Sequence, residues 1–185
     1  MRICLLSSTY PPEDTEGISR QRQTLATELA RLGHDVHVVT LGAFSHVRRE
    51  NGVTVHRVAF HWLNSFSNRY PGLDNTLTRS QALYEGLYGS LGTSGFDILD
   101  IPLWGTQGVV TQQFYAGCTI LWLQTTLAQI LKIHERPPSE EEQIKLTLEK
   151  MMLERAHGIL ADSQSVLDSV RSDYGISTGA PAGVA

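Results

Sequence analysis

The sequence has little of what marks several large classes of protein. It has only two cysteines, Cys4 and Cys118, and their spacing suits neither a zinc site nor a reactive pair. Each lies in a short apolar run, so we expect two buried thiols. No apolar run is long enough to cross a membrane, and the start turns polar at Ser7, too early for a signal peptide. The net charge of -4 gives no electrostatic reason to expect nucleic acid.

These absences favour a soluble, cytoplasmic protein with no nucleic-acid partner, although peripheral contact with a membrane is compatible with them. Several catalytic motifs are also missing. The sequence contains no P-loop, no Gly-x-Gly-x-x-Gly after the first strand, no Gly-x-Ser-x-Gly and no His-Glu-x-x-His. Asp97 and Asp100 are three apart on a predicted strand and point to opposite faces, so we expect no metal site there. A nicotinamide oxidoreductase is therefore the least favoured class.

The first forty residues hold the strongest positive signal. An apolar run at residues 2–6 is followed by a polar loop, and then by a helical repeat over residues 18–32 that ends at Gly33. A second apolar run follows at once, at residues 36–41. A strand, loop, helix and strand in this order predict a parallel sheet whose ligand site lies on the loop after the first strand.

The rest of the chain continues this alternation. The predicted strands are 53–58, whose alternation is compatible with an edge position, then 96–101, 118–123 and 158–162. The predicted helices are 76–91 with an end frayed by glycines, one opening within 105–113, 139–156 capped by Ser139 with Glu142, and 165–174 capped by Ser165 with Asp168. Residues 46–49 are expected to form a solvated basic turn, and residues 60–75 an irregular loop rich in aromatic residues. Residues 1–176 thus form one Rossmann-like α/β domain with helices on both faces, and residues 177–185 a linker or disordered tail.

Polar residues follow several predicted strands at one edge of the sheet. Gly17, in the loop after the first strand, permits close approach of an anion to the helix that follows, although a plain turn is as plausible. Gln124 and Thr125, then Trp104, then Ser163 follow three other strands and together suggest a crevice for a polar ligand. Trp104 packed in the core and Ser163 as a helix cap are at least as plausible. Arg20 and Arg22 stand in the first helical turn, where one could meet a ligand anion, although most such arginines are solvated.

The ordered pattern resembles the amino-terminal half of a family 4 glycosyltransferase, a retaining enzyme of the GT-B fold. The residues that carry the resemblance are 1–6 with Tyr10-Pro11-Pro12 and Gly17, then Leu25-Ala26, Leu29-Ala30, Gly33-His34, Val36 and Val38, then 96–100 with Pro102, Trp104 and Gly105, then Glu154, Ala156 and 158–163. The resemblance implies two facing domains, with the acceptor bound by this half and the nucleotide-sugar donor by the other, and with no metal. It implies that Glu16 and Gly17 lie beside the donor diphosphate, and that Tyr10, Arg20, Trp104, Gln124, Thr125 and Ser163 line the acceptor side.

Two positions depart from the family pattern. The first loop has Glu16-Gly17 where a glycine pair is usual, and Gln124 stands where many members carry a histidine. Glutamine can bond a sugar hydroxyl but carries no positive charge, so no catalytic residue is assigned. The resemblance also implies a carboxy-terminal domain that this chain lacks, so we expect the chain alone to be inactive.

The leading hypothesis is thus the acceptor-binding domain of a nucleotide-sugar-dependent hexosyltransferase, acting on a glycan or small-molecule acceptor. The alternatives are a non-catalytic carbohydrate- or nucleotide-binding module of the same fold, and an interaction domain that docks a protein on its polar edge.

Overall fold

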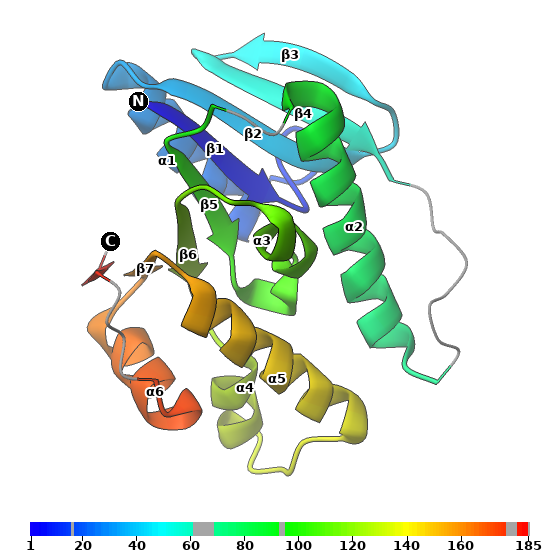
Figure 1. The fold of residues 1–185 in the computed structure, drawn as a ribbon, viewed down its shortest axis with the longest axis vertical. Coiled ribbons are helices and arrows are strands. Elements are labelled where there is room, and N and C mark those ends of the chain that lie inside the picture. The colour runs from blue at the N-terminus through cyan, green and yellow to red at the C-terminus, as the bar shows by residue number, and fades with distance from the viewer. Residues whose placement is uncertain (16, 61–68, 93–94, 177–180, 185) are drawn as a thin grey trace.

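The computed structural model describes residues 1–15, 17–60, 69–92, 95–176 and 181–184, and these form one sheet flanked by helices (Figure 1). The strand order is β3-β4-β2-β1-β5-β6-β7-β8. All neighbouring strands are parallel except β3 and β4, which are antiparallel. The predicted Rossmann-like α/β fold is therefore confirmed.

The strands and helices alternate along most of the chain. The strands are β1 (Arg2–Ser7), β2 (Asp35–Gly42), β3 (His46–Glu50), β4 (Val53–Ala59), β5 (Ile98–Pro102), β6 (Thr119–Leu123), β7 (Gly158–Ala161) and β8 (Ala182–Val184). The α-helices are α1 (Gly17–Arg31), α2 (Pro71–Leu91), α3 (Val109–Phe114), α4 (Leu127–Ile133), α5 (Glu140–Arg155) and α6 (Gln164–Tyr174), and a short 3₁₀ turn, η1, spans Trp104–Thr106. No described helix has the length and apolar character needed to cross a membrane.

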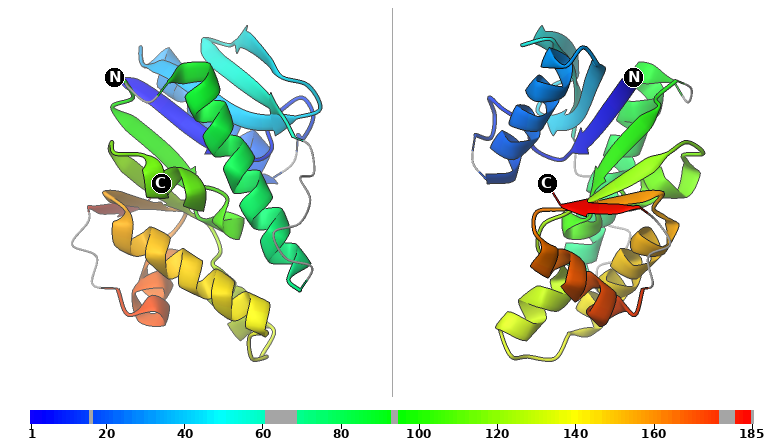
Figure 2. Two further views of the ribbon diagram at one scale, coloured as in Figure 1. Left: turned by 45° about the vertical axis from the view of Figure 1, so that its right-hand side comes forward. Right: turned by 90° about the vertical axis from the view of Figure 1, so that its left-hand side faces the viewer.

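The central strand β1 is buried on both faces, which explains its uninterrupted apolar run. Ile3 and Leu5 belong to a cluster beneath α1, whereas Cys4 and Leu6 belong to the larger cluster shared with α2, α3, α5 and α6. Figure 2 shows α1 on one side of the sheet and α3 and α5 on the other. The alternation of side chains along the strand thus supplies both layers of core.

The edge of the sheet differs from the prediction. Residues 46–49 are not a turn but most of β3, an exposed edge strand that pairs with β4. The strand at 53–58 is therefore second from the edge. Arg48 and Arg49 on β3 are the kind of charged residue that keeps an edge strand from pairing with another chain, which is why its pattern looks like a solvated turn.

The helix boundaries also required correction. Helix α2 begins at Pro71, so residues 71–75, predicted as loop, are helical, while 61–68 lie outside the described residues. Helix α4 was missed, although Thr126 and Gln129 form a full capping box. The cap of α6 is Ser163 rather than Ser165, and Asp168 instead accepts a hydrogen bond from Gln164.

Two further predictions concern the two cysteines and the last residues of the chain. Cys4 is fully buried as expected, but Cys118 is exposed because β6 begins only at Thr119. Residues 182–184, predicted as part of a linker or tail, form β8 beside β7. The linker role of this segment stays a prediction, and residues 177–180 and 185 lie outside the described part of the chain.

A pair of buried histidines joins β2 to β4. The Nδ1 of His37 lies 3.0 Å from the Nε2 of His56, and the rings are stacked with centroids 5.3 Å apart. Asp35 contacts the other nitrogen of His37 at 3.3 Å. Burial, with smaller effects from His37 and Arg2, lowers the pKa of His56 from its ordinary value to about 4.

We expect this pair to make the fold sensitive to acid. The pKa of His56 is lower in the folded than in the unfolded chain, so protons favour unfolding. Its contribution to stability is present above pH 6.5 and is lost as the pH falls toward 4. Urea unfolding of wild type and His56→Asn between pH 7 and 4 should show a shallower pH dependence in the variant. The exposed His134→Asn should keep the wild-type dependence, and the prediction is wrong if both variants do so.

Candidate functional site

The carboxyl ends of the strands carry two adjoining hollows at the place where the strand order reverses. The chain winds from β1 toward β2 and β4 in one direction and toward β5, β6 and β7 in the other. In open parallel sheets a ligand crevice lies at such a switch point, outside the carboxyl ends of the strands. The ligand site predicted from the first strand-loop-helix unit therefore has a matching hollow in the structure.

The first hollow, of about 500 Å³, opens between the loops that follow β1 and β5. The second, of about 410 Å³, lies over the ends of β6 and β7. Ile18 and Trp104 line both, so we treat the two hollows together as the cleft. The first hollow is lined by Ser7, Ser8, Thr9, Asp14, Gly17, Ile18, Pro102, Trp104 and Gln107, and the second by Ile18, Trp104, Gln124, Thr125, Asp162 and Val166.

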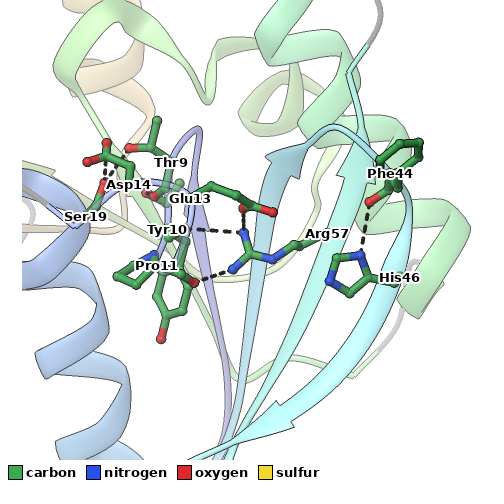
Figure 3. A network of polar contacts seen from close by, with 10 residues as sticks. Thr9, Tyr10, Pro11, Glu13, Asp14, Ser19, Phe44, His46 and Arg57 are labelled. Carbon is green, nitrogen blue, oxygen red and sulfur yellow. Dashed lines mark hydrogen bonds and ion pairs between the residues drawn. The ribbon is translucent and has the colours of Figure 1, made fainter.

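Side-chain hydrogen bonds fix the first loop, residues 8–15, before α1 begins. The hydroxyl of Ser19 donates to Asp14 at 2.8 Å and lies 2.6 Å from the hydroxyl of Thr9 (Figure 3). The amide of Ser8 donates to the side chain of Gln107, which follows η1. Gly17 then starts α1 with a positive φ of 45°, a conformation that L side chains rarely adopt.

Gln124 lines the second hollow and carries a buried polar atom without a partner. Its side-chain nitrogen donates to Gln21 of α1 at 2.9 Å, which fixes the orientation of the amide. Its Oε1 is buried and has no hydrogen-bond partner among the described residues. A buried oxygen without a partner is unfavourable, so a turn of the amide that brings this oxygen to a ligand hydroxyl in the cleft would relieve that cost. Thr125, beside it, is exposed on the same wall.

A buried arginine lies beneath this wall. Arg22, expected to be solvated or to bind an anion, is fully buried and donates to the side chain of Asp100 and to the carbonyl of Leu6. Its guanidinium lies 4.8 Å from the ring centroid of Trp122, and the Trp122 indole donates to Asp162 at 2.7 Å. Arg22 therefore links α1, which carries Ile18, to β1, β5 and β6.

The other predicted site residues lie in different parts of the structure. Trp104 is 39% exposed and lines both hollows, so it is not a core residue. The side chain of Tyr10 is buried in the cluster beneath α1, away from the cleft, and burial raises its pKa to about 12. Arg20 is exposed on α1, and neither hollow is lined by it. Ser163 caps α6 by accepting from the amide of Val166, while its neighbour Asp162 lines the cleft. Glu16 lies outside the described residues.

Gly17 lines the first hollow and Gln124 the second, whereas Ser163, which comes shortly after β7 at the same edge of the sheet, lines neither. Residues 181–184 are not among those that line either hollow. Sequence reasoning missed the roles of Asp162 and Gln107 as lining residues. A polar residue directly after the strand marks Asp162, but nothing in the sequence marks Gln107.

A smaller cavity of about 210 Å³ lies on the other side of Trp104, next to Glu149 of α5. The Glu149 carboxylate is 3% exposed and accepts from the amide of Leu127 and the hydroxyl of Tyr174. Burial raises the pKa of Glu149 to about 7 despite these two hydrogen bonds. The cavity wall therefore holds a carboxyl group that titrates near neutral pH.

This burial predicts a stabilising substitution. Because the pKa of Glu149 is higher in the folded chain, its contribution to stability is present below pH 4.5 and is lost as the pH rises through about 7. Glu149→Gln should be more stable than wild type at pH 8.5, by on the order of 2 kcal/mol, and should lose that advantage at pH 5. Urea unfolding at both pH values measures this, and an equal difference at both would contradict it. Glu154→Gln, on the exposed side of α5, is the control.

The cleft is chemically suited to a polar, partly anionic ligand. Its walls offer hydroxyls, two glutamine amides, an exposed indole and the amino end of α1, while Asp14 and Asp162 are its only described carboxylates. Among the described residues no three histidine, cysteine, aspartate or glutamate side chains gather closely enough to hold a metal ion.

The comparison with protein families gives one match. A family model described as Glycosyltransferase Family 4 matches residues 15–180. No curated protein matches the sequence.

Several solved structures share the fold at low sequence identity. Sucrose-phosphate synthase from Thermosynechococcus elongatus has a TM-score of 0.69 at 15% identity, over 99% of this chain and 47% of its own. Apo UGT2 of Phytolacca americana has a TM-score of 0.59 at 11% identity, over 98% and 51%. A UGT transferase from Siraitia grosvenorii, solved in complex with UDP, has a TM-score of 0.59 at 12% identity, over 99% and 50%. The chain spans about half the length of each of these proteins.

Proposed function

The chain belongs to glycosyltransferase family 4, and from this membership we propose that it is the acceptor-binding domain of a retaining, nucleotide-sugar-dependent glycosyltransferase. The fold is that of one half of a GT-B enzyme. A second, carboxy-terminal domain would close over the cleft and carry most of the nucleotide-sugar site. The chain alone would then transfer no sugar.

The observation that carries this proposal is the cleft itself. The amino end of α1, Ser8 and Thr9 line the first hollow, Gln124 lines the second, and Trp104 lines both. Helix amino ends favour phosphate groups because their amides are free and the dipole is positive there. Gln124 offers a sugar hydroxyl its unpaired oxygen. The helix amino end would bind the diphosphate, and the amide of Gln124 would bind a hydroxyl of the sugar next to it.

The residues present would act mainly by electrostatics and positioning. Amides near Gly17 would stabilise the charge that develops on the departing diphosphate, as fixed dipoles do in other transferases. Trp104 would stack on a sugar ring of the acceptor. Gln124 would orient a hydroxyl without exchanging a proton. We propose no metal ion in this reaction.

A second candidate is a non-catalytic carbohydrate- or nucleotide-binding module. The observation that favours it is Gln124, which cannot carry the charge of the histidine found in many relatives of the family. Glu16, which precedes Gly17 in the sequence, also favours this candidate, because the negative charge of a carboxylate and that of a diphosphate repel each other.

The two candidates are separated by a reconstitution. The chain is fused to, or mixed with, a family 4 carboxy-terminal domain and assayed with radiolabelled UDP-, GDP- and ADP-sugars for transfer and for hydrolysis. Turnover by the assembled form, and none by the chain alone, supports the enzyme. Binding of a glycan by calorimetry, without turnover in any assembled form, supports the module and overturns the enzyme.

A further inference from the structure

The first loop is fixed from outside the cleft by a single buried side chain. Arg57 on β4 is 3% exposed, and its guanidinium reaches across to residues 10–13. One nitrogen donates to the carbonyl of Tyr10 at 3.3 Å and to the carboxylate of Glu13, and the other donates to the carbonyl of Pro11 (Figure 3). Three acceptors of one loop thus converge on one planar cation.

This contact lies on the side of the loop that faces away from the cleft. The cleft is lined by Ser8, Thr9 and Asp14, which stand on either side of the segment that Arg57 holds, whereas Arg57 lines neither hollow. Residues 8–15 contain no helix or strand, so side chains and not a backbone ladder set their shape. Arg57 fixes the outer side, and Ser19 and Gln107 fix the inner side.

We propose that Arg57 is a positioning residue for the nucleotide-sugar site: it holds the first loop in the shape that presents Ser8, Thr9 and the start of α1 to the anionic part of the donor. The inference rests on the proposed function but adds a role to a residue that touches no substrate. Without this clamp the loop would sample other shapes, and only the fraction in the correct shape would bind.

Hydrogen exchange tests the clamp in the 185-residue chain. In Arg57→Met the amide of Ser8, which donates to Gln107, should exchange at least about tenfold faster, while amides of β5 and β6 keep the wild-type rate. Arg57→Lys keeps the positive charge but loses the planar guanidinium that donates from two nitrogens, so it should recover only part of the protection. Glu13→Gln should give a rise of roughly threefold. Arg48→Met, an exposed arginine of the same hairpin, is the matched control and should change nothing.

Kinetics of the assembled enzyme test the link to the donor. A clamp that only orders the loop should raise KM for the nucleotide sugar about tenfold in Arg57→Met and leave kcat within roughly twofold. Unchanged loop exchange, or acceleration spread evenly over the sheet, overturns the proposal. Should Arg57→Met fail to fold, Glu13→Gln and Arg57→Lys decide by the same two readouts.

The two proposals fail in different ways. Absence of transfer by the wild-type assembly overturns the proposed function, and with it the link to a nucleotide sugar, while the exchange result still decides whether Arg57 orders the loop. Loop exchange that rises in Arg57→Met while KM equals that of the Arg48→Met control overturns the role in donor binding alone.

Discussion

Gln124→Leu is expected to lower kcat/KM for sugar transfer in the assembled enzyme by on the order of 10- to 100-fold, without destabilising the chain. The substitution removes an amide oxygen that has no partner among the described residues and belongs to a side chain lining the cleft, so a ligand hydroxyl loses an acceptor. The same change removes an unsatisfied buried oxygen and only one hydrogen bond, to Gln21. Stability should therefore stay within about 1 kcal/mol of wild type or rise. Initial rates and urea unfolding measure the two effects.

Gln113→Leu is the matched control. The Nε2 of Gln113 on α3 is also buried without a partner, but Gln113 does not line the cleft. Removing its amide should affect stability as the Gln124 change does and should leave transfer untouched. Wild-type kcat/KM in Gln124→Leu, or an equal loss in both variants, would show that the oxygen of Gln124 meets no substrate.

The fold could be predicted where the signal lies within a short stretch of sequence. The run at residues 3–6 is apolar throughout because both faces of β1 are covered, and Ser139 with Glu142 caps α5 within four residues of sequence. The start of α2 could not be predicted in the same way. Tyr70 makes no side-chain cap there, and Pro71 at the first helical position can equally begin a turn.

The glycines of α2 show how a local signal can mislead. Gly86 suggested a frayed helix end, since glycine weakens helices. The structure gives another reason for it: a Cβ at Gly86 would stand 2.2 Å from Cγ2 of Val58. Helix and strand pack too closely for any side chain at this point. Which strand packs against a glycine depends on the tertiary structure, so it could not be predicted from the sequence alone.

The candidate site also contains some features that could be predicted from the sequence and others that could not. Gln124 and Gly17 were predicted because each follows a strand that ends at the same edge of the sheet. The burial of Arg22 and Arg57 was not predicted, because a buried arginine and a solvated one look the same in the sequence. What separates them is the partner: Asp100 lies 78 positions from Arg22, and Glu13 lies 44 from Arg57. Such pairs form only when the sheet brings distant loops together.

Gly108→Val is expected to destabilise the chain by about 3 kcal/mol or more. Gly108 caps the start of α3 with φ of -101°, which any residue can adopt, so backbone strain is not the cause. The cause is space: a Cβ at this position would lie 1.9 Å from Cγ2 of Ile101, which is fully buried in β5. Neither the strand nor the packed core can move aside cheaply, so α3 would have to shift.

A double-mutant cycle separates this clash from other causes. Gly108→Ala should cost about 1–3 kcal/mol, and Ile101→Ala alone about 2–5 kcal/mol through the cavity that it leaves. Combined, the two should cost less than their sum, because the new methyl occupies space that Ile101 has vacated. Gly89→Ala on α2, where nothing lies within 4 Å, should be neutral or stabilising. Strict additivity of the first two changes in urea unfolding would mean that α3 does not rest on Ile101. A shift of α3 would also move Trp104, because α3 begins shortly after η1. Gly108→Ala should therefore lower the rate of sugar transfer only to the extent that the cycle shows a clash with Ile101.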